Sequence, residues 1–242
     1  MSIKRFTAEG FRCLGHIELE PDRNYTLIYG ANASGKTSLL EALAYLGRGK
    51  SFRGAPRANL IQHGEQEFVL FGHVEAGGRL SSVGVRNSRR GLEVKIDGDS
   101  SGGAAALAAA LPLQVIDPDV HNLVSGGPDE RRRFLDWLAF HVEPEYLALW
   151  RQFRRSLKQR NAALKMGGRR ESLSAWDKEF CRLGERLDAA RQAVLATAVE
   201  TLRDHGSGLL GVDIDFRYAH GWSKEKSLEE ALEDHFERDR AL

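Results

Sequence analysis

The sequence predicts an α/β protein with antiparallel strands in its first half and helices in most of its second half. Three observations support this fold class. A G-x-x-x-x-G-K-T motif joins an expected strand, residues 25–29, to an expected helix, residues 38–46. Apolar and polar residues alternate in short runs between residues 67 and 97, as they do in half-buried strands. After Pro128, apolar residues recur every three or four positions, which is typical of helices.

The other strands follow from the same kind of pattern. Gly10 turns the chain between the first two, and Asp97-Gly98 closes the last of the short antiparallel strands. An alanine-rich run, residues 104–113, predicts a packed helix that leads into a buried strand. Besides residues 25–29, the expected strands are residues 3–9, 14–20, 68–74, 81–86, 93–97, 113–117 and 212–218.

The second half begins with Pro128, which suits a first helical position, and the acidic residues after it suit the positive end of a helix dipole. Two long helical segments then meet at Gly167-Gly168 and should pack antiparallel as an arm over approximately residues 144–203. A last helix is expected over residues 228–242. We therefore expect two domains: a lobe with the glycine-rich motif and the antiparallel strands, residues 1–127, and a mostly helical lobe, residues 128–242.

Composition narrows the class of protein. The 242 residues include 35 basic and 34 acidic side chains, so the net charge of +1 says nothing about partners. The two cysteines, Cys13 and Cys181, are too few for a disulfide scaffold, and we expect both to be reduced thiols. The longest apolar run, residues 104–113, is much shorter than the ~20 residues of a membrane span, and no signal peptide is evident. A cytoplasmic protein is expected, without a membrane partner.

Residues 30–37 have the residue types that a nucleoside triphosphate requires. Glycines let the loop curl until successive backbone N–H groups face one anion. The Lys36 ammonium reaches the outer phosphates, the Thr37 hydroxyl takes a Mg²⁺ position, and the following helix directs its positive end at the phosphates. We therefore expect ATP and Mg²⁺ as cofactors. The nucleotide-binding residues are Gly30, Ala31, Asn32, Ala33, Ser34, Gly35, Lys36 and Thr37.

Further segments resemble a known family. The Gly10-Phe11-Arg12 turn and the loop with its helix are similar to the start of the SMC-like ATPases. Within that group the chain resembles the RecF family of recombination mediators. The segments that carry this resemblance are GKSFR at residues 49–53, LVSGGP at 123–128, RRRFLD at 131–136 and QRNAALK at 159–165. The resemblance implies an ABC/SMC-type ATPase head with a helical second lobe.

The resemblance also implies a function. Such proteins bind single-stranded or gapped DNA, hydrolyse ATP slowly and dimerise around two nucleotides. With other recombination mediator proteins they act as an ATP-dependent clamp switch in recombinase loading, replication restart and the SOS response. Gln114 falls where the family places a glutamine that contacts Mg²⁺ and the attacking water, although it is equally well a polar residue in a strand. Arg12 reaches the nucleotide, or it is a solvated surface arginine.

Parts of the family pattern are absent from the sequence. We find no signature motif, no strand ending in an acidic pair (the Walker B motif) and no later histidine. Ser125-Gly126-Gly127 imitates the signature motif, but Pro128 follows it, and the segment is better explained as the cap of a helix. We therefore expect an N-terminal fragment that binds ATP without appreciable hydrolysis, because phosphoryl transfer depends on positioned water and metal.

The first helix of the arm is strongly basic. Residues 146–170 hold eight basic side chains and no Asp or Glu. Such a run attracts the phosphate backbone of DNA through counterion release. The alternative is a solvated face paired with acids of the neighbouring helix: Glu171, Asp177, Glu179 and Glu185. The DNA-binding candidates are Arg151, Arg154, Arg155, Lys158, Arg160 and Lys165.

Two other functions are consistent with the loop. A phosphotransferase acting on a small molecule would need a lid over its acceptor, and the helical arm suits an interaction surface better. A structural SMC-like linker would need a much longer coiled coil than this arm provides.

Overall fold

The computed structural model describes residues 1–100, 102–167 and 170–240. They form two compact units, Met1–Pro118 (unit 1) and Asp119–Leu242 (unit 2). The division falls earlier than residue 127, the end of the first lobe expected from the sequence. The reason is Arg131, whose guanidinium donates to the carbonyl oxygens of Val124 and Gly126 at 3.3 and 2.9 Å. These bonds fasten the short helix α3 (Asn122–Ser125) to unit 2.

Unit 1 contains one antiparallel sheet in the order β2-β1-β3-β4-β5-β6. The alternating pattern predicted its five longer strands, and these predictions are confirmed. The two-residue strand β6 carries no pattern of its own. The strands are β1 (Ser2–Phe11), β2 (Leu14–Leu19), β3 (Glu67–Ala76), β4 (Arg79–Ser88), β5 (Gly91–Ile96) and β6 (Asp99–Ser100).

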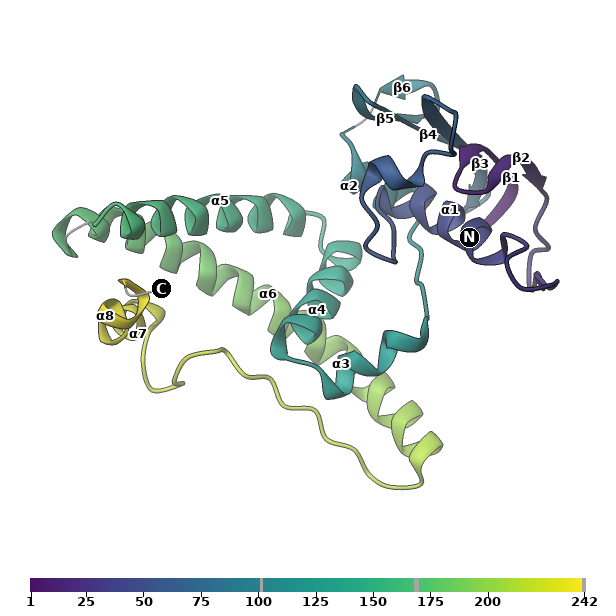
Figure 1. Cartoon of the computed structure of the whole chain (residues 1–242). Coiled ribbons are helices and arrows are strands. Elements are labelled where there is room, and N and C mark those ends of the chain that lie inside the picture. The colour runs from purple at the N-terminus through teal and green to yellow at the C-terminus, as the bar shows by residue number, and fades with distance from the viewer. Residues whose placement is uncertain (101, 168–169, 241–242) are drawn as a thin grey trace. The chain divides into compact units, whose positions relative to one another are not determined.

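Helices α1 (Lys36–Arg48) and α2 (Ala104–Ala110) pack beside this sheet (Figure 1), and a short 3-10 helix, η1 (Arg57–Leu60), follows α1. The core between them is aromatic, because Phe11, Tyr45 and Phe68 meet edge to face with centroids 4.9–6.1 Å apart. Close approach of α1 requires a glycine in β3. A Cβ on Gly72 would lie 2.7 Å from Cδ2 of Leu46.

Three predicted strands are wrong. Residues 25–29, 113–117 and 212–218 are extended but pair with no strand among the residues that the structure describes. Alternation shows only that a segment has two different faces, whereas a strand also needs a hydrogen-bonding neighbour. In the first segment Leu27 is 84% exposed, while Ile28 packs on the core. The segment thus has one exposed and one buried face, although no neighbouring strand in the described part of the chain forms hydrogen bonds with it.

Unit 2 is helical, as predicted. After the 3-10 turn η2 (Pro118–His121), which spans the boundary, and α3, its helices are α4 (Pro128–Val142), α5 (Tyr146–Lys165), α6 (Arg170–Leu210), α7 (Leu228–Asp234) and α8 (Phe236–Arg240). The expected last helix is thus two helices separated at His235, and residues 241–242 lie outside the described residues. Among the described residues, no helix is both long and apolar enough to cross a bilayer.

Helices α5 and α6 pack antiparallel, as their apolar spacing predicted (Figure 1). The rings of Phe153 and Phe180 lie 5.2 Å apart between centroids, and Arg160, about two turns further along α5, pairs with Asp177, which precedes Phe180 in α6. The predicted turn between the helices includes Gly168, which lies outside the described residues.

The carboxylate of Asp136 on α4 connects the three long helices. It accepts hydrogen bonds from the Tyr146 hydroxyl (2.5 Å) and the Trp150 indole N–H (3.2 Å) on α5, and it pairs with Arg191 on α6 at 2.7 Å. Burial, together with the bond to this carboxylate, raises the pKa of Tyr146 above its usual value. The hydroxyl therefore stays protonated, and remains a donor, to a higher pH than an ordinary tyrosine.

Replacing Asp136 with Ala should lower the free energy of unfolding of unit 2 by about 3–5 kcal/mol, because a largely buried guanidinium, that of Arg191, loses its carboxylate. Urea unfolding followed by tryptophan fluorescence measures this unit, since every tryptophan lies in it. These residues are Trp137, Trp150, Trp176 and Trp222.

The matched control is Asp129→Ala on the same helix. Asp129 is 73% exposed in its side chain and pairs with Arg132 within one turn, so its loss should change the free energy of unfolding much less than the loss of Asp136. Equal losses for the two variants would show that Asp136 does not connect the helices in the way described.

Candidate functional site

The phosphate-loop segment, residues 30–37, is curled between an extended segment and α1. Its backbone has positive φ angles at Gly30 (149°), Ala33 (63°) and Gly35 (92°), which L side chains seldom adopt. Space around Gly35 is also tight, because a Cβ there would lie 3.2 Å from Cδ2 of Leu14 and 3.3 Å from Sγ of Cys13. Residues of the β1–β2 hairpin therefore lie directly against the phosphate loop.

Lys36, the first residue of α1, closes the loop. Its ammonium donates to the carbonyl oxygens of Gly30 (2.9 Å) and Ala31 (2.6 Å). The first N–H groups of any helix lack an acceptor within the helix, and the helix dipole adds positive potential at this end. The motif residues thus place one ammonium and a helix N-terminus around a single exposed loop, which suits a phosphate chain.

Thr37 and Gln114, far apart in sequence, line the same cavity of about 570 Å³ in unit 1. Thr26, on the extended segment before the loop, also lines it, as does Asp22 at the bend that precedes this segment. The sequence predicted a metal role for Thr37 and a tentative catalytic role for Gln114, and the structure brings their side chains to one place. The Gln114 amide donates only a long bond of 3.4 Å to the Val115 carbonyl.

Arg12 lies in the β1–β2 turn at φ 56° and points toward α1. Its Nε and Nη2 donate to the two carboxylate oxygens of Glu41 at 3.1 and 3.0 Å, and its Nη1 donates to the Asn59 carbonyl at 3.2 Å. Glu41 is fully buried and also accepts a short hydrogen bond from the Ser51 hydroxyl. Arg12 is therefore neither a free surface arginine nor free to extend toward a nucleotide without giving up these bonds.

Sequence reasoning missed Glu41, although a signal was available. Ser38, Glu41, Ala42 and Tyr45 follow the spacing of one helix face, and Ala42 and Tyr45 are core residues. A carboxylate on an apolar face requires a partner. The sequence gives no indication which of its many arginines supplies it.

A second candidate site is the basic face of α5. Five of the predicted residues are exposed and form no ion pair with any other described residue. At 100° per residue they fall within about 100° of arc, so they make one stripe along the helix. Arg154 lies over the ring of Trp150 at 5.5 Å. We call this set the α5 stripe: Arg151, Arg154, Arg155, Lys158 and Lys165.

Arg160 does not belong to the stripe, and its predicted DNA contact is wrong. It is 4% exposed, pairs with Asp177 at 2.6 Å and Asp239 at 3.2 Å, and lies over the ring of Phe180. Its position is about 180° around the helix from Arg151, on the face that packs. Arg169, which the sequence also counted in the basic run, lies outside the described residues.

Two of the four acids proposed to neutralise the stripe are engaged elsewhere. Asp177 pairs with the buried Arg160, and Glu179 pairs with Arg182 on its own helix at 2.7 Å.

The described residues contain no cluster of three or more His, Cys, Asp or Glu side chains that could hold a metal.

Loss of the Arg12 side chain should destabilise the hairpin and α1 by about 3–5 kcal/mol, because Glu41 would remain buried without its cation. Hydrogen exchange followed by mass spectrometry should show faster exchange in α1 of the Arg12→Ala variant. Arg5→Ala is the matched control, since Arg5 on β1 pairs with Glu18 at the surface and should contribute about 0–1 kcal/mol.

A double variant checks the cause. Arg12→Met with Glu41→Leu removes both charges and should recover most of the lost stability. Unchanged exchange in Arg12→Ala, combined with weaker ATP binding, would contradict the structural role and place Arg12 at the nucleotide.

The family model described as RecF/RecN/SMC N terminal domain matches residues 2–183. The DNA replication and repair protein RecF of Sodalis glossinidius (strain morsitans) is 40% identical over 247 residues, and that of Yersinia pseudotuberculosis serotype O:1b is 41% identical over 244 residues. Each alignment covers 100% of this chain and 68% of the relative.

Solved structures of RecF proteins have a similar fold. A structure of the recombination mediator protein RecF-ATP in the RecFOR pathway has a TM-score of 0.85 at 23% identity, and a RecF-ATPrS structure has 0.84 at 24%. Each match covers 99% of this chain and 68% of that chain. The likeness confirms the predicted α/β fold of the ABC/SMC-type ATPases.

Proposed function

The chain belongs to the RecF family, and we propose on that premise that it is an ATP-binding protein of DNA replication and repair. The observation that carries the proposal is the curled loop at residues 30–37, closed by Lys36 at the start of α1. The curated relatives are DNA replication and repair proteins by name, and the solved RecF structures were obtained with ATP or an analogue. The loop supplies the corresponding site in this chain.

Mg²⁺ would accompany the nucleotide. Mg²⁺ prefers oxygen ligands and keeps several waters, usually bridging one or two protein groups and substrate phosphates. The Thr37 hydroxyl and the Gln114 amide oxygen fit this requirement, since both are neutral oxygen donors on one cavity next to the loop. The ion would neutralise phosphate charge, while Lys36 and the α1 N-terminus bind and orient the phosphates.

The α5 stripe is the proposed DNA-contacting surface. Its cations are exposed and free of ion pairs within the described part of the chain, so no carboxylate has to be displaced when phosphates approach. A stripe of this kind recognises the backbone rather than bases, which is compatible with single-stranded or gapped DNA. Homodimerisation with ATP, assistance to recombinase loading with mediator proteins, replication restart, the SOS response and a cytoplasmic location remain proposals from the family resemblance.

Replacing Lys36 with Ala should weaken ATP binding by at least about tenfold, because each charge-assisted hydrogen bond contributes roughly 1.5–3 kcal/mol. Titration calorimetry with ATP and Mg²⁺ measures the affinity, and circular dichroism checks the fold. Lys95→Ala, which removes an equal charge from the exposed side of β5, is the control and should bind ATP like the parent. Equal affinity of Lys36→Ala and the parent would refute the assignment of the loop.

Reversing three charges of the α5 stripe should weaken DNA binding and flatten its salt dependence. In Arg154→Glu/Arg155→Glu/Lys158→Glu, each lost phosphate contact lowers the slope of log affinity against log salt by about 0.9 on duplex DNA and about 0.7 on a single strand. Fluorescence anisotropy with a gapped duplex over a salt series measures both quantities. ATP affinity should not change.

The control makes the same change in net charge on paired arginines. Arg132, Arg133 and Arg182 each already pair with an acid one turn away, so their reversal should alter the slope much less. A stripe variant with the parent's affinity and slope would mean that this face is only solvated and that DNA binds elsewhere.

A further inference from the structure

The chain that follows α6, residues 211–227, returns along that helix without forming a helix or strand before α7 begins (Figure 1). We call residues 211–227 the returning segment. Two glycines of α6 let it approach. A Cβ on Gly206 would lie 2.5 Å from Cδ1 of Ile214, and a Cβ on Gly184 would lie 2.7 Å from Cδ2 of Leu228. The returning segment is therefore seated on α6 near both of its ends.

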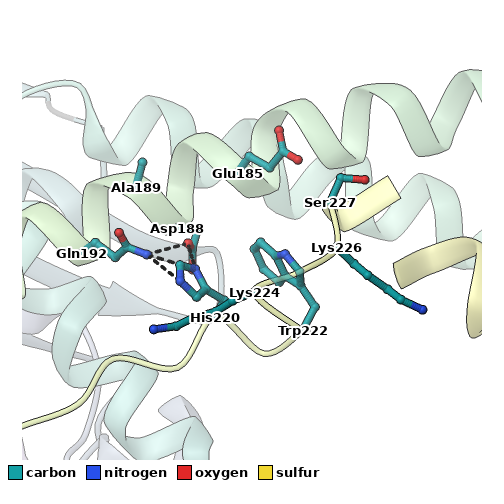
Figure 2. Close-up of a pocket in the computed structure, with 9 residues that line it drawn as sticks. All are labelled: Glu185, Asp188, Ala189, Gln192, His220, Trp222, Lys224, Lys226 and Ser227. Carbon is teal, nitrogen blue, oxygen red and sulfur yellow. Dashed lines mark hydrogen bonds and ion pairs between the residues drawn. The ribbon is translucent and has the colours of Figure 1, made fainter. Parts of the chain in front are cut away.

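Between these two points the buried carboxylate of Asp188 fixes the segment. It accepts hydrogen bonds from the Tyr218 hydroxyl and His220 Nδ1, both at 2.6 Å, and from the Gln192 amide at 3.3 Å. The Gln192 amide nitrogen also lies 3.0 and 3.1 Å from Nδ1 and Nε2 of His220 (Figure 2). Asp188 and Gln192 together hold the histidine ring in place, so it acts as a positioning group.

This anchor also places Trp222. The rings of Tyr218, His220 and Trp222 follow one another with centroids 5.4 and 5.6 Å apart. Figure 2 shows the indole of Trp222 between side chains of α6 and the backbone of the returning segment. The indole is held from one side by His220 and lines a cavity with Glu185, Ala189 and Lys224.

The cavity has a volume of about 530 Å³, within the range of small-ligand sites, roughly 300–1,000 Å³. Of its charged groups, Lys226 is engaged by Asp234 at 2.5 Å, and Asp188 is satisfied by its three donors. Lys224 and Glu185 make no ion pair with another described residue. The cavity thus offers one aromatic face, one ammonium and one carboxylate.

A nucleotide with an unstacked base has the complementary groups. Bases of single strands stack on aromatic side chains, and a lysine ammonium binds the phosphate. A carboxylate accepts from the exocyclic amino group of a base such as cytosine. Bases inside a duplex cannot reach an indole in this way, because their faces are covered by their neighbours.

We propose that this cavity binds one unstacked nucleotide of a nucleic-acid single strand, with its base on Trp222, its phosphate on Lys224 and a base amino group on Glu185. The site rests on the proposed DNA-binding function and adds to the α5 stripe, which recognises backbone charge alone. It would let the protein distinguish single-stranded regions from duplex.

Fluorescence anisotropy with labelled oligodeoxycytidylate and a duplex of equal length tests the proposal. Trp222→Ala should weaken binding of the single strand roughly tenfold and leave the duplex affinity unchanged. Trp222→Phe keeps an aromatic face and should retain most of the affinity, which separates loss of stacking from loss of the segment's structure. Thermal unfolding of each variant confirms that unit 2 is intact.

The two lysines provide a matched pair. Lys224→Gln should reduce the salt slope for the single strand by about 0.7, whereas Lys226→Gln, which loses only an internal ion pair, should not. Glu185→Gln should reduce the preference for oligodeoxycytidylate over oligothymidylate, because thymine has no amino group to donate. Free deoxycytidine monophosphate should compete only weakly if a strand is the ligand, and complete competition at micromolar concentration would reassign the cavity to a free nucleotide.

The outcomes separate the two proposals. A parent protein that binds neither single strand nor duplex refutes the DNA-binding function and this site together. A parent that binds the single strand with an affinity that Trp222→Ala retains overturns this site alone. Equal weakening of single strand and duplex in Trp222→Ala also overturns it, since stacking on an unstacked base cannot act on a duplex.

Discussion

The buried carboxylate of Glu41 is the constraint on which the geometry of unit 1 depends. A charge in a core is tolerated only when an opposite charge and hydrogen bonds compensate its lost hydration. Arg12 supplies these from the β1–β2 turn, in a backbone conformation that few residues adopt. The helix and the turn must therefore dock together, and the residues next to Arg12, Cys13 and Leu14, are the ones that press against Gly35 of the phosphate loop. The geometry of the phosphate loop therefore depends in part on an ion pair that lies outside the loop.

Buried or partly buried charged groups with several partners also connect the elements of unit 2. Asp136 gathers donors from α5 and α6, and Asp188 gathers donors from its own helix and from the returning segment. Arg160 makes a third such connection, between α5, α6 and α8. The charged groups Asp136, Asp188 and Arg160 are engaged inside the unit and are not available to bind a partner at its surface. What remains unpaired on α5 is a stripe of one sign, which is why the stripe, and not the total number of basic residues, is the better indication of a nucleic-acid partner.

Local patterns predicted the parts of the structure that are local in origin. The phosphate loop, the hairpin strands and the long helices depend on residue type and spacing over a few positions, and the structure reproduces them. The failures involve partners distant in sequence. Residues 25–29 were expected to form a strand but have no strand beside them within the described part of the chain, and Glu41 meets an arginine 29 residues away. Arg160 is different, because the helical period alone places it opposite the stripe, and counting charges without placing them around the helix caused that error.

The division of the chain into two units bears on the competing functions. The loop lies in unit 1, whereas the α5 stripe and the Trp222 cavity lie in unit 2. A clamp switch requires a coupling free energy between them: if ATP changes the affinity for DNA by some factor, DNA must change the affinity for ATP by the same factor. A phosphotransferase needs no such reciprocity, because its acceptor would have to meet the nucleotide at the loop itself. A purely structural linker would bind partners with no dependence on ATP. Reciprocal coupling, rather than binding of either ligand alone, is therefore the property that defines the function proposed for this chain.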